Sequence, residues 1–188
     1  SQQLRDKWGV TLFEFTLRGL FDHRFLHADP NFANFAFRED GRVAVYDYGC
    51  MKEIPEDLAA GYARLMDAVI HRRKGAIPEL LRSMGVYKEG GATLPRKMTD
   101  PYVDVIQDIV RKSPPFTFGA DNSIYESLYE LGMSNWQHAS DIRFPRDAVF
   151  IDRTLGGLFG NLSTLRATGP WRELLLKHLA PAIDLQNE

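Results

Sequence analysis

Three polar side chains between residues 29 and 47 have the types and the spacing needed to bind a divalent cation. Asp29 is followed five residues later by Asn34, and Asp47 stands at the end of an extended apolar run. Mg²⁺ prefers such oxygen ligands and usually takes one or two carboxylates, while phosphate and water fill its remaining positions. This set favours phosphoryl transfer, in which metal ions neutralise a triphosphate and a carboxylate orients the attacking hydroxyl.

A β-hairpin is expected to bring these groups together. The runs 35–38 and 42–46 are rich in aromatic and β-branched residues, and the Asp-Gly pair at 40–41 is a preferred two-residue turn. Counting outward from this turn places Asn34 directly opposite Asp47. Opposed residues on antiparallel strands have Cα atoms about 4.5–5.5 Å apart. The first aspartate lies in the loop that leads into the same end of the hairpin.

Most of the remaining chain has helical periodicity. An apolar stripe predicts a helix over 4–25, and Pro55 suits the first turn of a second helix. The cationic run 71–74, followed by Gly75, is expected to end that helix, with its cations at the negative pole of the helix dipole. Further helices are expected at about 76–84, 99–112, 123–138, 145–167 and 170–179.

Composition narrows the class of protein. The chain has 188 residues, 44% of them hydrophobic, and a net charge of −2. Without an overall positive field there is no electrostatic case for nucleic-acid binding. The single cysteine, Cys50, cannot form an internal disulfide. No apolar run reaches the roughly 18 residues that suggest a membrane span.

The order of the polar residues matches the protein-kinase pattern of a catalytic-loop Asp, an Asn five residues later, a hairpin and then Asp-Phe-Gly. Here Asp-Tyr-Gly occupies 47–49. The sequence His-Ala-Asp-Pro at 27–30, followed by Asn34, resembles the UbiB/AarF family of atypical, protein-kinase-like proteins. The signature of that family reads His-Ala-Asp-Pro-His-Pro-Gly-Asn and leads to Asp-Phe-Gly. The segments 19–26 and 152–171 also resemble the family, with less specific motifs.

The resemblance implies a role for each matching residue. Asp29 would be the catalytic-loop aspartate, Asn34 a metal ligand, Asp47 the metal-chelating aspartate and His27 a structural histidine that bonds backbone carbonyls. The chain departs from the signature at 31–33, where Asn-Phe-Ala replaces His-Pro-Gly. This change leaves the metal-binding side chains in place and puts the path of the loop in question.

The resemblance also implies an α+β, predominantly α-helical fold: the C-terminal lobe of a protein-kinase-like protein, with one small β-hairpin carrying the metal-binding end. We expect a single domain over 1–188. The glycine-rich loop and the Lys-x-Gly-Gln motif, which belong to an N-terminal lobe, are absent from this sequence. With that lobe, the full-length protein is expected to bind Mg²⁺ and ATP, whereas the isolated fragment would be inactive.

The implied biology is a link to ubiquinone and isoprenoid lipid metabolism, with membrane or lipid contact in the full-length protein. The compartment stays open: cytoplasmic or membrane-peripheral in a bacterium, organellar in a eukaryote. Two other functions also remain open. One is a small-molecule phosphotransferase of the aminoglycoside or choline kinase type, and the other is a non-catalytic, pseudokinase-like module.

A glycine-rich stretch at 156–160 resembles a phosphate-binding loop in composition alone. It does not follow a predicted strand, so close helix packing is the favoured interpretation. The sequon 161–163 lies inside a predicted helix, and we do not interpret it as a glycosylation site.

Overall fold

The computed structural model describes residues 1–120, 123–135 and 140–184. Its helices are α1 (Gln2–Leu17), α2 (Glu56–Ile70), α3 (Ile77–Ser83), α4 (Arg96–Ile109), α5 (Ser123–Asn135), α6 (Ala148–Leu165) and α7 (Trp171–Asp184). Its strands are β1 (Phe25–His27), β2 (Phe35–Phe37), β3 (Val43–Val45), β4 (Met51–Glu53), β5 (Tyr87–Lys88) and β6 (Ile142–Arg143). They form three antiparallel pairs, β1 with β4, β2 with β3 and β5 with β6. The predicted α+β, predominantly helical class is confirmed.

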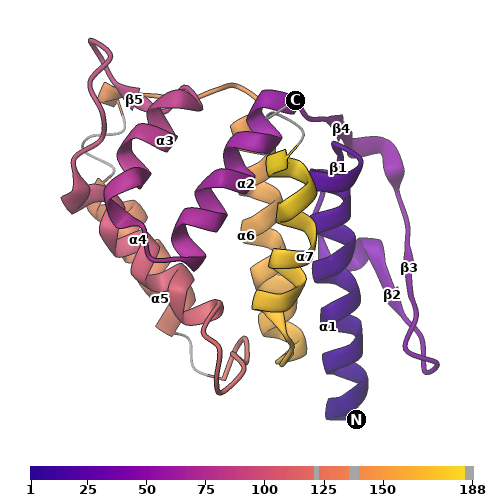
Figure 1. Ribbon diagram of the computed structural model, residues 1–188. Helices are drawn as coiled ribbons and strands as arrows, with labels where there is room; N and C mark the ends of the chain where they lie inside the picture. Colours follow the sequence, from indigo (N-terminus) through magenta and orange to yellow (C-terminus); the bar gives the residue numbers. More distant parts are fainter. Residues whose placement is uncertain (121–122, 136–139, 185–188) are drawn as a thin grey trace.

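Helices α1, α2, α6 and α7 pack around a shared hydrophobic core (Figure 1). The hairpin β2–β3 lies on one flank of these helices, and α3, α4 and α5 lie on the other. Trp171 at the start of α7 is 1% exposed, and its ring centroid lies 5.0 Å from that of Phe13 and 5.3 Å from that of Phe118. Its indole nitrogen donates to the Phe116 carbonyl at 2.7 Å, so the segment before α5 is tied to the helical core.

The predicted first helix is too long at its carboxyl end. The α-helical hydrogen bonding ends at Leu17, and one π-helical turn covers Arg18–Asp22. Arg24 then adopts a left-handed conformation with φ of 52°, and Phe25 starts strand β1. The apolar periodicity continues through this region and gives no sign of the change in backbone. The other predicted helices agree to within a few residues, and 136–138 of the predicted fifth helix lies outside the described residues.

The hairpin forms where predicted, but its register differs by one residue. Phe37 pairs with Val43, and Arg38 and Arg42 close the ladder, with the Arg38 N–H donating to the Arg42 carbonyl at 2.9 Å. The connection is therefore a three-residue loop, 39–41, rather than a two-residue turn. Gly41 ends it in the left-handed region with φ of 85°, as is common for three-residue hairpin loops.

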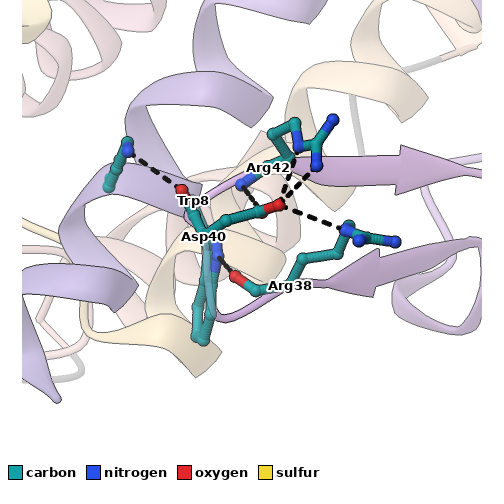
Figure 2. Close-up of polar contacts among 5 residues, drawn as sticks. Trp8, Arg38, Asp40 and Arg42 are labelled. Carbon is teal, nitrogen blue, oxygen red and sulfur yellow. Dashed lines mark hydrogen bonds and ion pairs between the residues drawn. The ribbon is translucent and has the colours of Figure 1, made fainter.

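The side chain of Asp40 explains this choice of loop (Figure 2). Its carboxylate accepts a hydrogen bond from the Arg42 backbone N–H at 3.0 Å, which is the Asx arrangement that reverses a chain. The Arg42 guanidinium donates to the same carboxylate at 2.6 and 2.8 Å. Hydrogen bonds from Arg42 hold the pKa of Asp40 well below its usual range. On the other side of the loop, the indole nitrogen of Trp8 donates to the Arg38 carbonyl at 2.9 Å and anchors the hairpin to α1.

We predict that Asp40→Asn destabilises the chain at neutral pH. The stability difference between wild type and variant should disappear in acid. A lowered folded-state pKa means that ionised Asp40 stabilises the fold above the ordinary carboxyl pKa of about 3.9. That contribution disappears as the pH falls through the lowered value. Urea unfolding of wild type and variant at a series of pH values checks this, with the exposed neighbour Glu39→Gln as control. A difference in stability that stays constant down to acid pH would contradict the assignment.

Candidate active site

The pairing of β1 with β4 brings the predicted site residues to one end of these strands. His27, the last residue of β1, lies opposite Met51, the first residue of β4. Because the strands are antiparallel, the chain that leaves β1 and the chain that enters β4 meet at this end. Asp29 follows β1 by two residues, and Asp47 lies four residues before β4. The two aspartate-bearing segments therefore flank the same end of the strand pair.

Asp29 and Asn34 are in direct contact. The amide nitrogen of Asn34 donates to Oδ2 of Asp29 at 2.7 Å and is 3.3 Å from the Asp29 carbonyl oxygen. These contacts orient the carboxylate and close the loop between the two residues. They use the amide nitrogen of Asn34 and not its amide oxygen, which is the atom that a metal ion binds.

The three residues that depart from the family signature form a local structure of their own. The Asn31 side chain accepts from the Ala33 N–H at 3.0 Å and caps a 3₁₀ turn over Phe32–Asn34. The Phe32 ring lies 5.0 Å from the ring of Phe37 in β2. The loop therefore accommodates the bulky residue by packing it on the hairpin, and Asn34 still reaches Asp29.

Asp47 has an uncommon backbone conformation. With φ of 55° and ψ of 81°, it lies in the left-handed region, which costs a residue other than glycine about 1–3 kcal/mol. Its side chain accepts from the Gly49 N–H at 3.0 Å, and its carbonyl is 3.1 Å from Nε2 of His27. His27 is 4% exposed. The predicted structural role of this histidine, bonding a backbone carbonyl, is confirmed by that contact.

The predicted pairing of Asn34 with Asp47 is wrong by one residue. The Asn34 carbonyl accepts from the Tyr46 N–H at 2.8 Å, so Tyr46 lies across from Asn34 and Asp47 follows it. The reason is the three-residue loop, which shifts every pair of the hairpin. Asn34 thus contacts Asp29 through its side chain. The segment that carries Asp47 meets Asn34 through the backbone hydrogen bond from Tyr46.

The donor set fits Mg²⁺ better than a transition metal. One amide oxygen, from Asn34, and one carboxylate, from Asp47, match the small number of protein ligands that Mg²⁺ takes when phosphate completes its shell. Within residues 1–120, 123–135 and 140–184, no group of three or more His, Cys, Asp or Glu side chains is arranged to hold a metal ion.

Helix α6 supports the loop from the far end of the sequence. Arg153 donates to Oδ1 of Asp29 at 3.3 Å, and the Asn161 amide donates to the Pro30 carbonyl at 2.9 Å. Between them, Gly157 packs so closely on Pro30 that an added Cβ would lie 2.2 Å from Cγ of the proline. The expectation that the glycine-rich stretch serves close helix packing is confirmed at Gly157.

Sequence reasoning missed Arg153 and Asn161 as site residues. Together with Gly157 they recur every four residues, which places all three on one face of a helix. This spacing was available in the sequence, but the partner of that face was not. Arg153 is a long, exposed side chain whose ion pair with Asp29 depends on how α6 docks.

Residues 2–81 match the family described as "ABC1 atypical kinase-like domain", a segment that contains Asp29, Asn34 and Asp47. Two curated relatives extend the similarity beyond this segment. Atypical kinase COQ8, mitochondrial, from Schizosaccharomyces pombe is 25% identical over 96% of this chain. An aarF domain-containing protein kinase from Arabidopsis thaliana, At1g71810, chloroplastic, is 26% identical over 81% of the chain. Together these similarities support the UbiB/AarF family of atypical kinase-like proteins, with the family match itself confined to residues 2–81.

The chain spans less than a third of the length of those relatives, 30% of the first and 22% of the second. A solved structure, the complex of Rv3197 with erythromycin from Mycobacterium tuberculosis, matches its fold with a TM-score of 0.74. The match covers 97% of this chain and 45% of the other, at 18% identity. The structural match supports a kinase-like fold. The evidence for the candidate site comes from the sequence relatives and from the contacts described above.

Two findings bear on location. The name of the Schizosaccharomyces pombe relative places it in the mitochondrion, and the name of the Arabidopsis thaliana relative places it in the chloroplast. Within the described part of the chain, no helix combines the length and apolar character that crossing a bilayer requires.

We predict opposite effects for two neighbouring glycines of α6. Gly157→Ala forces Pro30 to move and should destabilise the chain, since overpacking costs about 1–3 kcal/mol. Gly156→Ala meets nothing within 4 Å and should stabilise it by up to about 1 kcal/mol through helix propensity. Denaturant unfolding checks both values. NMR shifts of the amides of residues 29–34 should change in the first variant only, and equal behaviour of the two would refute the packing argument.

Proposed function

We propose that residues 1–188 form one domain, the C-terminal lobe of an atypical kinase or ATPase that binds Mg²⁺ and ATP together with an N-terminal lobe. The observation that carries this proposal is the 2.7 Å contact between Asn34 and Asp29. It lies at the strand end where the Asp-Tyr-Gly segment 47–49 begins its turn. The family assignment favours this function over a phosphotransferase of the aminoglycoside or choline kinase type.

In this proposal Asn34 and Asp47 hold the metal. The Asn34 amide presents its oxygen because its nitrogen is engaged by Asp29, and Asp47 has a second carboxylate oxygen besides the one that accepts from Gly49. Bound Mg²⁺ supplies neutralisation of the negative charge on the triphosphate. The left-handed backbone of Asp47 and its bond to His27 keep that carboxylate in place before a ligand arrives.

Asp29 is proposed as the group that orients the attacking hydroxyl or water and accepts its proton. Its Oδ2 is held by the short contact with Asn34. Its Oδ1 has a longer contact, 3.3 Å, with the exposed guanidinium of Arg153. Displacing a long, solvated ion pair costs little, so Oδ1 is the oxygen available to the acceptor group.

Exposed aromatic side chains next to the site support docking of an N-terminal lobe. Tyr46 and Tyr48 are 56% and 58% exposed, and they flank Asp47 in the chain. Clustered apolar exposure of this kind marks a surface for contact with another protein part. The lobe would contribute the lysine and the phosphate-covering loop that this sequence lacks. Membrane or lipid contact and a link to ubiquinone metabolism rest on the family resemblance.

We predict that Asp47→Ala abolishes Mg²⁺-dependent ATP binding, because it removes the carboxylate ligand of the metal. Titration calorimetry on the complete gene product, with and without Mg²⁺, measures this. Glu53→Ala, on the opposite end of the same strand pair, is the control and should bind as wild type does. Retained Mg²⁺-dependent binding in Asp47→Ala would remove Asp47 from the metal site.

Asp29→Ala should lower turnover by about 10²–10⁴, the range typical of a lost general base. Because it also frees the amide of Asn34, it should weaken Mg²⁺–ATP binding, but less than Asp47→Ala does. Steady-state ATP hydrolysis by the complete gene product measures this effect. Unchanged turnover in Asp29→Ala would exclude the proton-acceptor role. Mg²⁺–ATP binding by the wild type without any turnover would support the pseudokinase-like alternative.

A further inference from the structure

A second concave region is lined by none of Asp29, Asn34 and Asp47, and the proposed function does not use it. It is a cavity of about 400 Å³ between α2, α3 and α4, on the side of the molecule away from the β2–β3 hairpin (Figure 1). Aliphatic side chains form most of its wall, among them Leu65, Val69, Leu81, Val103 and Ile106. The volume lies within the 300–1,000 Å³ typical of small-molecule sites, which are mostly apolar with a few placed polar groups.

One carboxylate interrupts this apolar wall. Asp152, in the first half of α6, is the only charged residue among the described residues that line the cavity. Its Oδ1 accepts a hydrogen bond from the Tyr62 hydroxyl at 2.7 Å, and Tyr62 is only 8% exposed. The carboxylate is therefore held in a fixed orientation by a buried side chain.

The environment of Asp152 is unusual for an acid. Its side chain is solvent-accessible because it borders the open cavity, yet surrounding protein removes water from it and raises the pKa of its carboxyl, against the opposing effect of the Tyr62 hydrogen bond. In the described part of the chain no lysine, arginine or histidine forms an ion pair with it. A carboxylate can accept about four hydrogen bonds, and the Tyr62 hydroxyl uses one of them, so Asp152 can accept a further donor from the cavity.

We propose that this cavity binds a small apolar molecule that carries one hydrogen-bond donor, a hydroxyl or a protonated amine, directed at Asp152. The apolar body packs between α2, α3 and α4, and the donor gives the acid a second hydrogen-bond partner in addition to Tyr62. An anionic amphiphile such as a fatty acid is excluded by charge, since its carboxylate would face another carboxylate. The site is separate from the metal-binding loop and does not depend on the function proposed above.

Three probes of equal chain length test the ligand class: 1-octylamine, 1-octanol and octanoate, each titrated into the complete gene product by calorimetry. We expect saturable 1:1 binding of the amine, the alcohol or both, and at least tenfold weaker binding of octanoate. Binding of only one donor identifies which donor type the site prefers. Equal binding of octanoate, or no binding of any probe, would overturn the proposal.

Two sets of variants locate the site. Asp152→Asn keeps an acceptor for Tyr62 but removes the charge, and it should weaken octylamine binding at least tenfold and octanol binding less. Asp104→Asn, an exposed acid of α4 outside the lining, is the matched control and should bind as wild type does. If octylamine and octanol both bind Asp152→Asn as they bind wild type, Asp152 is not their partner.

Filling the cavity tests its location without touching Asp152. Ile106→Trp, from the half-buried wall of α4, and Leu81→Phe, from α3, should each abolish binding of all probes. Val105→Trp is the control, because Val105 is the neighbouring residue and does not line the cavity. Circular dichroism and thermal melting verify that each variant is folded. Undiminished binding in a folded blocking variant would place the ligand elsewhere.

Discussion

The hydrogen bond from the amide of Asn34 to the carboxylate of Asp29 is the contact on which the candidate site depends. It links the two ends of a six-residue loop and fixes which atoms of each side chain remain available. A free carboxylate in water samples many orientations, and holding it costs side-chain entropy. Here that cost is met by folding, before any ligand is present. Such preorganisation is what electrostatic catalysis requires.

The rest of the site is held by contacts between side chains and backbone groups. Asp47 keeps a left-handed conformation, and its carbonyl and carboxylate are each bonded, to His27 and to the Gly49 N–H. A strained residue persists only when its surroundings determine it. The strain at Asp47 is therefore evidence that this turn is specified by the fold around it, and the β1–β4 pair and the buried histidine provide those surroundings.

The sequence was informative where local chemistry decides the structure. Helix positions follow from apolar periodicity, and the five-residue spacing of Asp29 and Asn34 beside the hairpin predicts that the two residues converge on one small volume. The hairpin register was predicted one residue off, because an Asp-Gly pair serves both two- and three-residue loops. The side-chain bond from Asp40 to the Arg42 N–H favours the longer loop, and residue composition does not reveal that bond.

Contacts between distant segments could not be predicted from one sequence. The four-residue repeat of Arg153, Gly157 and Asn161 marks a helix face, yet nothing in it indicates that the face meets residues 29 and 30. The same holds for Asp152, whose position beside an apolar cavity depends on how α6 lies against α2 and α4. Long-range packing sets both sites, and it becomes visible only in three dimensions.

Because Gly157 lies so close to Pro30, the side-chain size allowed at one position depends on the residue at the other. Residue 157 can gain a side chain only if residue 30 becomes smaller, so substitutions at the two positions should be strongly non-additive although they are far apart in sequence. The position of the loop that carries Asp29 therefore depends on α6, a helix near the opposite end of the chain. Engineering that exchanges or redesigns α6 in isolation would shift the loop as well, and a graft of the 27–49 segment into another scaffold must bring its glycine-bearing helix along.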